Sequence, residues 1–222
     1  MIIKSKPVSP FIFKLGTAII GLVFKRKCKN LVIEPFEIKP DHSYILMCNH
    51  FSFWDGFWAG YLCRKIFFKK DGMQRLYIMS VKKQMEKNKI LQYMGSFSVE
   101  PGKRSITESF DYIAEILSQP GNLLLFYPQG NLESAFIRHI KFDEGLYEIV
   151  TRITGNCQLV WSSNLVEFYE SFKPSIYSQM LDCGTNHNFD FDALKQKVNA
   201  FHLDSIKKLV RYTEEPKDGM SL

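Results

Sequence analysis

A histidine and an aspartate five positions apart are the residues of this sequence best suited to chemistry. His50 and Asp55 follow an apolar run at residues 44–48 that has the pattern of a short buried strand. An imidazole at a strand end can act as a general base near neutral pH. A carboxylate on its other nitrogen fixes its tautomer and stabilises the imidazolium. Because the pair belongs to no serine or cysteine nucleophile pattern, it predicts direct transfer, in which His50 activates a hydroxyl or amine that attacks an acyl donor.

The same spacing occurs a second time, between His187 and Asp192, so spacing alone does not identify a catalytic pair. His187 lies in a polar stretch ahead of a helical pattern, where Asp190 or Asp192 is expected to cap the helix at its N-terminus. His50 instead follows a buried strand. The surrounding sequence therefore favours His50 as the base.

Further motifs accompany the first pair in a fixed order. Residues 49–55, Asn-His-x-Ser-x-x-Asp, resemble the first block of the lysophospholipid and glycerol-phosphate acyltransferase family. Later segments are similar to that family's next blocks: the glycine and strand at 95–99, the strand ending in Pro-Gln-Gly at 123–130, the stretch at 141–145 and the strand-like segment at 158–161. The resemblance runs from about residue 31 to residue 168. It implies acyl transfer with His50 and Asp55 as the catalytic pair.

Two blocks depart from the family at positions associated with the acceptor's phosphate. Pro101 stands where an arginine is usual after the second block. In the third block, Gln129 and Leu132 replace the usual glutamate and arginine. Losing two guanidinium groups removes the bidentate clamp best suited to phosphate. We therefore expect lysophosphatidate to be a poor acceptor, and a neutral or amino-linked lipid, or a glycolipid or pigment hydroxyl, to be a better one.

Residues around these blocks are candidates for substrate binding. Basic side chains near the altered positions could rebuild the clamp or be solvated surface charge; they are Lys103, Arg104, Arg138 and Lys141. Gly130 would let the backbone approach a ligand, and Gln129 can hydrogen-bond a hydroxyl. The predicted substrate contacts are Asn49, Ser52, Lys103, Arg104, Gln129, Gly130, Asn131 and Lys141.

Aromatic residues crowd the His50–Asp55 pair. They are Phe51, Phe53, Trp54, Phe57 and Trp58. They could form plain core packing, an apolar wall for an acyl chain, or an aromatic belt at a lipid interface. Ser52 is expected to cap the helix that begins near Asp55.

Composition limits the class of protein and of partner. With 222 residues the chain is long enough for one domain with a sizeable core. Its five cysteines form no C-x-x-C pair, which indicates reduced thiols in a cytosolic setting. Cys48 and His50 lack a second ligand pair, so we expect no metal, and no prosthetic cofactor is implied. The net charge of +6 suggests an anionic partner; no nucleic-acid motif is present, and an anionic membrane surface fits better.

The N-terminal segment also favours an anionic membrane surface as the partner. Residues 11–24 are apolar apart from Lys14 and Thr17, and as a helix they would span about 21 Å, short of a hydrocarbon core of about 30 Å. Basic residues follow at 25–27 and 29. We expect residues 1–30 to be a peripheral membrane-contact segment on the cytoplasmic face, and residues 31–222 to be the acyltransferase domain. A core helix docked on the domain is the alternative, and both could hold on different faces.

Strand-like and helix-like patterns alternate along the chain. Strands or extended segments are expected at 31–33, 44–48, 76–79, 97–99, 123–127, 159–168 and 176–181. Helices are expected at 55–68, 82–94, 105–117, 145–153 and 191–212, with a capping box at 105–108. This alternation predicts an α/β fold with a mostly parallel central sheet flanked by helices. His50 and Gly130 would then meet at the carboxyl edge of the sheet.

These observations predict an acyltransferase that uses an acyl-CoA or acyl-carrier-protein thioester and a lipid acceptor. Donors near Gly130 or at the helix start would stabilise the oxyanion. Two other functions stay open: a lipid-binding protein of the same fold without turnover, and a thioesterase with water as acceptor.

Overall fold

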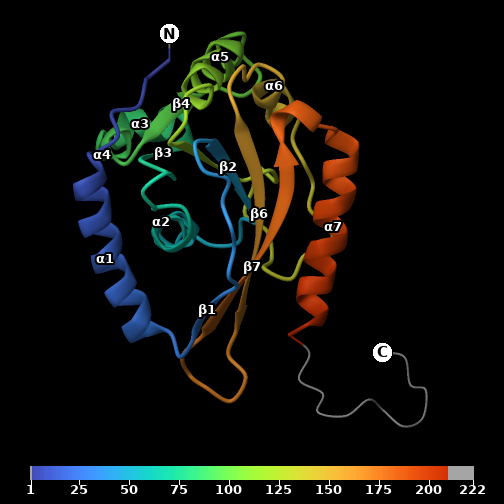
Figure 1. The fold of residues 1–222 in the computed structure, drawn as a ribbon. Helices are drawn as coiled ribbons and strands as arrows, with labels where there is room; N and C mark the ends of the chain where they lie inside the picture. Colours follow the sequence, from blue (N-terminus) through green and yellow to red (C-terminus); the bar gives the residue numbers. More distant parts are fainter. Residues whose placement is uncertain (1, 210–222) are drawn as a thin grey trace.

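A seven-stranded sheet forms the centre of the computed structural model, which describes residues 2–209 (Figure 1). Its strands are β1 (Leu31–Ile33), β2 (Ser43–Cys48), β3 (Arg75–Val81), β4 (Ser96–Val99), β5 (Asn122–Phe126), β6 (Cys157–Glu167) and β7 (Ser175–Thr185). Their order is β1-β7-β6-β2-β5-β3-β4, and every neighbouring pair is parallel except β6 and β7. The predicted α/β class with a mostly parallel sheet is confirmed, and β2, the strand before His50, lies in the middle.

Helices cover both faces of this sheet. They are α1 (Pro10–Lys27), α2 (Asp55–Ile66), α3 (Lys82–Lys87), α4 (Ile90–Tyr93), α5 (Ser105–Leu117), α6 (Gly145–Val150) and α7 (Phe191–Lys207), with a 3-10 turn η1 (Asn186–Asn188). α2 packs on one face with α1 outside it, whereas α5, α6 and α7 cover the other face (Figure 1).

The burial of β2 explains its continuous apolar sequence. All six of its residues are buried, because helices cover the sheet on both sides. Ile45 and Met47 join the core under α5 and α6, while Tyr44 and Leu46 join the core under α2. The strand is thereby fixed from both faces, and the turn that carries His50 starts from a rigid base.

The helix predicted at residues 82–94 is wrong in its extent. It breaks into α3 and α4, with Asn88 at the end of α3. The side chain of Asn88 accepts a hydrogen bond from the backbone N–H of Ile90 at 3.2 Å. Asparagine competes in this way with the helical backbone, so a short turn replaces the continuous helix.

Two predicted N-terminal caps also need correction. α5 begins at Ser105 without a side-chain cap, because the Ser105 hydroxyl bonds the carboxylate of Glu100 at 3.2 Å. The N-cap residue of α2 is Trp54 and has no side-chain cap bond, so Ser52 does not cap that helix. The cap predicted for the last helix is confirmed, since Asp190 accepts from the N–H of Ala193 at 2.9 Å. Residues 210–212 of that predicted helix lie outside the described residues.

α1 has one packed face and one exposed face. Thr17 and Gly21 are buried against α2, where a Cβ at Gly21 would come within 2.6 Å of the Tyr61 ring. Large apolar side chains point outward from the opposite side of the helix and are half or more exposed: Phe11, Ile12, Leu15, Ile19, Leu22 and Val23. None of the helices within residues 2–209 is long and apolar enough to cross a membrane. The docked face and the apolar outer face thus coexist on one helix.

Candidate active site

His50 and Asp55 are joined directly by a hydrogen bond. The Nδ1 atom of His50 lies 2.9 Å from Oδ2 of Asp55. β2 ends at Cys48 and α2 begins at Asp55, so the turn between them brings the ring back to the first residue of the helix. The same Oδ2 accepts the backbone N–H groups of Phe51 at 2.7 Å and Ser52 at 2.8 Å. These donors hold the carboxylate in place, and the N-terminal end of α2 favours its negative charge.

This arrangement orients the imidazole for proton abstraction. A neutral ring that donates from Nδ1 to Asp55 carries its lone pair on Nε2. The Asp55 side chain is only 6% exposed, whereas that of His50 is 27% exposed. The carboxylate is therefore shielded, while the base remains open to a substrate.

The segment after β5 lies beside the segment after β2. The two strands are parallel neighbours, with Met47 opposite Phe126. Buried Gln129 accepts the backbone N–H of His50 through Oε1 at 2.7 Å and donates from Nε2 to the carboxylate of Glu133. The N–H of Glu133 in turn donates to the carbonyl oxygen of His50 at 2.8 Å. As predicted, the first and third blocks meet at the carboxyl edge of the sheet.

An aromatic ring covers one side of the base. The rings of His50 and Tyr127 are stacked, with centroids 4.3 Å apart and planes inclined by 25°. The Tyr127 hydroxyl is buried and has no hydrogen-bond partner within residues 2–209. Desolvation by burial, aided by the charge of nearby groups such as Asp55, raises the pKa of Tyr127 well above its usual value. Tyr127 is thus a neutral ring that restrains the imidazole.

Comparisons with known proteins identify the family and the fold of the chain. Residues 30–161 match the family model described as Acyltransferase, which covers more than half of the chain. The chain belongs to the acyltransferase family. Its fold is similar to the crystal structure of the 1-acyl-sn-glycerophosphate (LPA) acyltransferase PlsC from Thermotoga maritima, with a TM-score of 0.59, 13% identity, and coverage of 91% of this chain and 82% of that chain. No curated protein sequence matches the chain.

Cys48 of this acyltransferase lies just before the site but is no nucleophile. It is buried and unpaired with another cysteine. Desolvation raises the pKa of the Cys48 thiol far above its ordinary value, so the thiol stays protonated. Burial likewise raises the pKa of Cys157 and Cys183 to about 12.

Asn49 of the acyltransferase is bonded within the protein, and its predicted contact with a substrate stays a prediction. It is fully buried, and its side-chain amide bonds both backbone groups of Asn164 on β6, each at 2.8 Å. The side chain of Asn164 accepts a bond from Trp58 Nε1 at 3.1 Å. Asn49 therefore ties the end of β2 to β6 and, through it, to α2.

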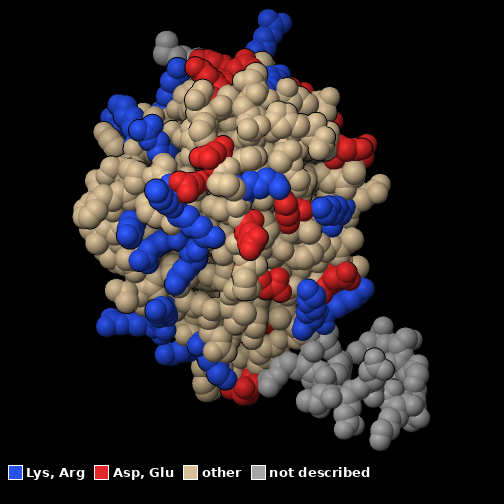
Figure 2. Space-filling view, in the orientation of Figure 1, with Lys and Arg blue, Asp and Glu red and all other residues tan. Residues whose placement is uncertain are grey.

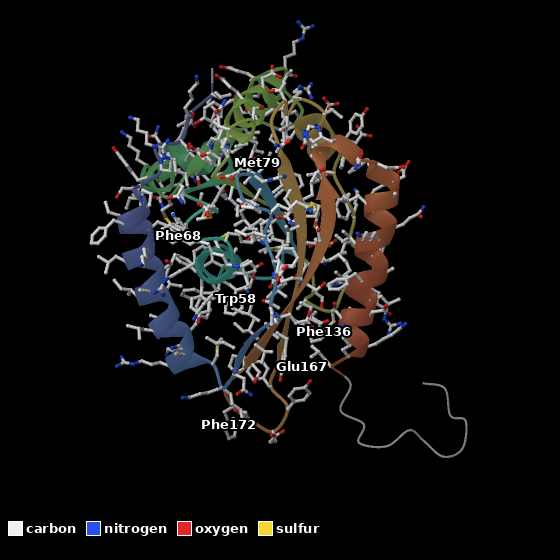
Figure 3. The ribbon with its side chains drawn as sticks, viewed as in Figure 1. Trp58, Phe68, Met79, Phe136, Glu167 and Phe172 are labelled. Atoms are coloured by element: carbon white, nitrogen blue, oxygen red, sulfur yellow. The ribbon has the colours of Figure 1, made fainter. Side chains whose placement is uncertain are left out.

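The aromatic residues near the pair differ in how deeply they are buried. Trp58 is buried and packs against α1, where its ring lies 5.3 Å from that of Phe24 (Figure 3). Phe53 and Trp54 expose 79% and 60% of their surface. Ser52 accepts the N–H of Trp54 at 3.1 Å and so shapes the turn that presents both exposed rings. Core packing describes Trp58, whereas a role of the exposed Phe53 and Trp54 toward an acyl chain or a lipid interface stays a prediction.

The backbone conformation at position 130 requires glycine. Its φ is +69°, a conformation that favours glycine, and a Cβ there would lie 2.7 Å from the Asp143 carboxylate. Its N–H donates to the carbonyl oxygen of Tyr127 at 3.2 Å. The turn keeps Gln129 buried against His50, and the close approach of a ligand to Gly130 stays a prediction.

The basic candidates are not drawn into the site. Lys103 pairs with Glu100 at 2.9 Å, and hydrogen bonds from Lys103 and Lys82 lower the pKa of Glu100 to about 2. The basic residues Arg104 and Lys141 are exposed, and so is the neutral Asn131, another predicted contact. Within residues 2–209, no hydrogen bond or ion pair joins any of these residues to His50 or Asp55.

Glu133 and Tyr127 are site residues that the sequence patterns missed. Tyr127 stands directly before the Pro-Gln-Gly turn, and the expected meeting of His50 and Gly130 at the carboxyl edge of the sheet would have placed it near His50. No sequence signal marks Glu133, because its contact depends on the course of the chain after Gly130.

Proposed function

We propose that this acyltransferase moves a fatty acyl group from an acyl-CoA or acyl-carrier-protein thioester to a hydroxyl or amine of a lipid acceptor. The observation that carries the proposal is the 2.9 Å bond between His50 Nδ1 and buried Asp55, at a turn that leaves the ring accessible. His50 is the general base, and Asp55 orients it.

The reaction follows from this geometry. Nε2 of His50 takes the proton of the acceptor as its oxygen or nitrogen attacks the thioester carbonyl. The tetrahedral intermediate then collapses, the carbon–sulfur bond breaks, and the thiolate leaves with the proton returned by His50. Asp55 stabilises the imidazolium between these steps. The N–H groups of Phe51, Ser52 and Gly130 already have acceptors, so other donors must bind the oxyanion.

The acceptor is a lipid without a phosphate monoester at the site. A phosphate monoester needs charge-assisted bonds, usually from guanidinium groups. Here Leu132 is exposed, Lys103 is already paired, and Glu133 adds a carboxylate beside Gln129. A negative acceptor would be repelled by Glu133, whereas a neutral hydroxyl or an amine would not.

The proposed setting is the cytoplasmic face of a membrane, with peripheral attachment through α1. Its outward apolar face supports this, as do the basic residues of its last turn, Lys25, Arg26 and Lys27. Substituting Phe11, Leu15 and Ile19 by serine should reduce sedimentation with anionic vesicles while α1 stays packed on α2. Sedimentation equal to that of the wild type would refute this attachment.

The central experiment offers labelled acyl-CoA and acyl carrier protein with a panel of lipid acceptors. Labelled lipid in the wild type, absent from His50→Ala, supports acyl transfer. Free labelled acid without labelled lipid would identify a thioesterase. Lipid binding without consumption of any donor would identify a binding protein.

A further inference from the structure

A basic cavity lies between α1, α2 and the turn after α2, away from His50. Its volume is about 590 Å³. Its charged lining residues are all cations: Lys14, Arg64, Lys65, Lys69 and Lys70. Several blue side chains gather left of centre in Figure 2, over the region where Figure 1 places α1 and α2. Five cations therefore surround one hollow that no acidic residue lines.

These cations are not neutralised by acidic side chains of the described residues. Inside residues 2–209, none of the five forms an ion pair with an acidic side chain, although Lys65 lies over the Tyr61 ring at 5.7 Å. Arg64 and Lys65 fall in the last turn of α2, where they also complement the helix dipole. That explanation does not extend to the other three cations, which come from α1 and from the turn.

The packing around the cavity holds its walls in place. Phe68, labelled in Figure 3, stacks on Phe13 of α1. The two ring centroids are 5.8 Å apart. In the turn, the N–H of Gly72 donates to the carbonyl of Lys69 at 3.2 Å, and a Cβ at Gly72 would lie 2.3 Å from the Phe67 carbonyl oxygen. The turn is therefore compact, and the α1 side of the cavity is fixed to it.

The position of Lys14 connects the cavity with the outer face of α1. Lys14 and Phe11 are three residues apart on the helix and so adjoin on its surface. Phe11 is 75% exposed and belongs to the outward apolar face. A molecule with its phosphate among the cations could thus lay an apolar tail along α1.

We propose that this cavity binds the phosphate of an anionic phospholipid headgroup, at a site separate from the catalytic one. The proposal rests on the membrane attachment proposed above. Phosphate chemistry could also be supplied by the nucleotide part of CoA. The lipid is favoured because Arg64 lies nine residues after Asp55, about 14 Å along α2, and because the cavity adjoins the apolar face of α1.

The test uses water-soluble dihexanoyl phosphatidate below its micellar concentration, with dihexanoyl phosphatidylcholine as the zwitterionic control. Calorimetric titration of the full chain should show saturable binding of the phosphatidate only. Lys69→Gln/Lys70→Gln should weaken it about 30-fold, since each basic residue contributes about a fivefold factor. Lys195→Gln/Lys207→Gln on α7 removes the same charge from the other side of the sheet and should change it less than twofold.

Titration with CoA distinguishes a lipid phosphate from a CoA phosphate as the ligand of the cavity. Titration with CoA should give the same affinity for the wild type and Lys69→Gln/Lys70→Gln. A loss of CoA binding without a loss of phosphatidate binding would assign the cavity to the donor and overturn the proposal, as would equal phosphatidate binding by all variants. No turnover and no vesicle enters these titrations, so their failure is distinct from a failure of acyl transfer or of α1 attachment.

Discussion

His50 and His187 each lie five residues before an aspartate, but their hydrogen-bond partners differ. His50 bonds Asp55 through Nδ1, with the carboxylate buried. His187 lies exposed in η1, and its Nε2 bonds the side chain of Asn156 at 2.8 Å. Asp192 lies in the first turn of α7 and pairs with a lysine of that helix. Equal spacing thus gives a hydrogen-bonded pair in one region and two unrelated surface residues in the other.

The difference lies in what precedes each histidine. β2 is buried in the middle of the sheet, and the tight turn from β2 to α2 directs the ring of His50 to the first residue of the helix. β7 pairs antiparallel with β6, and the chain after it runs along the protein surface into α7. A turn between a parallel strand and the helix after it builds a site; the exit from an antiparallel hairpin does not.

The largest expected effect distinguishes His50 from His187 through a pair of alanine variants. His50→Ala should lower the rate of acyl transfer by about 10²–10⁴-fold, because it removes the general base. His187→Ala should leave the rate nearly unchanged, since the hydrogen bond between His187 and Asn156 lies at the surface. Steady-state rates with a labelled thioester donor measure both. Near-normal turnover in His50→Ala together with loss in His187→Ala would reverse the assignment.

A second variant tests whether the buried carboxylate matters to the base. Asp55→Asn should lower the rate by about 10²–10⁴-fold, because an amide can also donate to Nδ1 and so favours the wrong tautomer. Two backbone N–H groups lose their charged acceptor as well, so stability must be measured beside activity. An Asp55→Asn protein with a normal melting temperature and a normal rate would show that His50 works without its partner.

The third prediction concerns the acceptor and compares the retained first block with the altered third one. In a competition between lysophosphatidate and a phosphate-free lipid alcohol, label should enter the alcohol about a hundredfold or more faster, because two charge-assisted bonds of roughly 1.5–3 kcal/mol each are lacking for the phosphate. Label mainly in phosphatidate, abolished by Arg104→Ala, would mean that shifted basic residues rebuild the clamp.

A related variant asks whether the family pattern can simply be restored. Gln129→Glu with Leu132→Arg should slow the native reaction without improving the use of lysophosphatidate. Glutamate at 129 would lose the amide donor to Glu133 and bring two carboxylates together. The matched control is Leu132→Arg alone, which changes an exposed side chain and should have little effect. Improved use of lysophosphatidate by the double variant would contradict this reading of the third block.

Most of the fold was predictable because the pattern of apolar residues indicates which segments are buried. The strand before His50 is apolar at every position, as a strand covered on both faces must be. The break between α3 and α4 was not predictable from periodicity, since it depends on one side-chain bond of Asn88. The antiparallel pairing of β6 and β7 depends on contacts between segments that periodicity describes only as extended.

The site was predictable where chemistry and local turns coincide, and not where distant segments meet. The His50–Asp55 contact follows from a strand-to-helix turn of a few residues. The burial of Asn49 against Asn164 depends on β6 lying beside β2, which no local pattern specifies. The sequence suggested that Lys103 could bind a substrate, but Lys103 forms an ion pair with Glu100, three positions before it.

The smallest expected effect separates the ring of Tyr127 from its hydroxyl. Tyr127→Leu removes the stack on His50, worth about 0.5–1.5 kcal/mol, so the rate should fall about two- to tenfold. Tyr127→Phe keeps the ring and removes a buried hydroxyl without a partner inside residues 2–209, so the rate should hold and the free energy of unfolding should rise by about 1 kcal/mol. Rates and denaturant unfolding of both variants decide the matter. If Tyr127→Phe loses activity as Tyr127→Leu does, the hydroxyl has a role in the reaction, and the stacked ring is not what distinguishes the environment of His50 from that of His187.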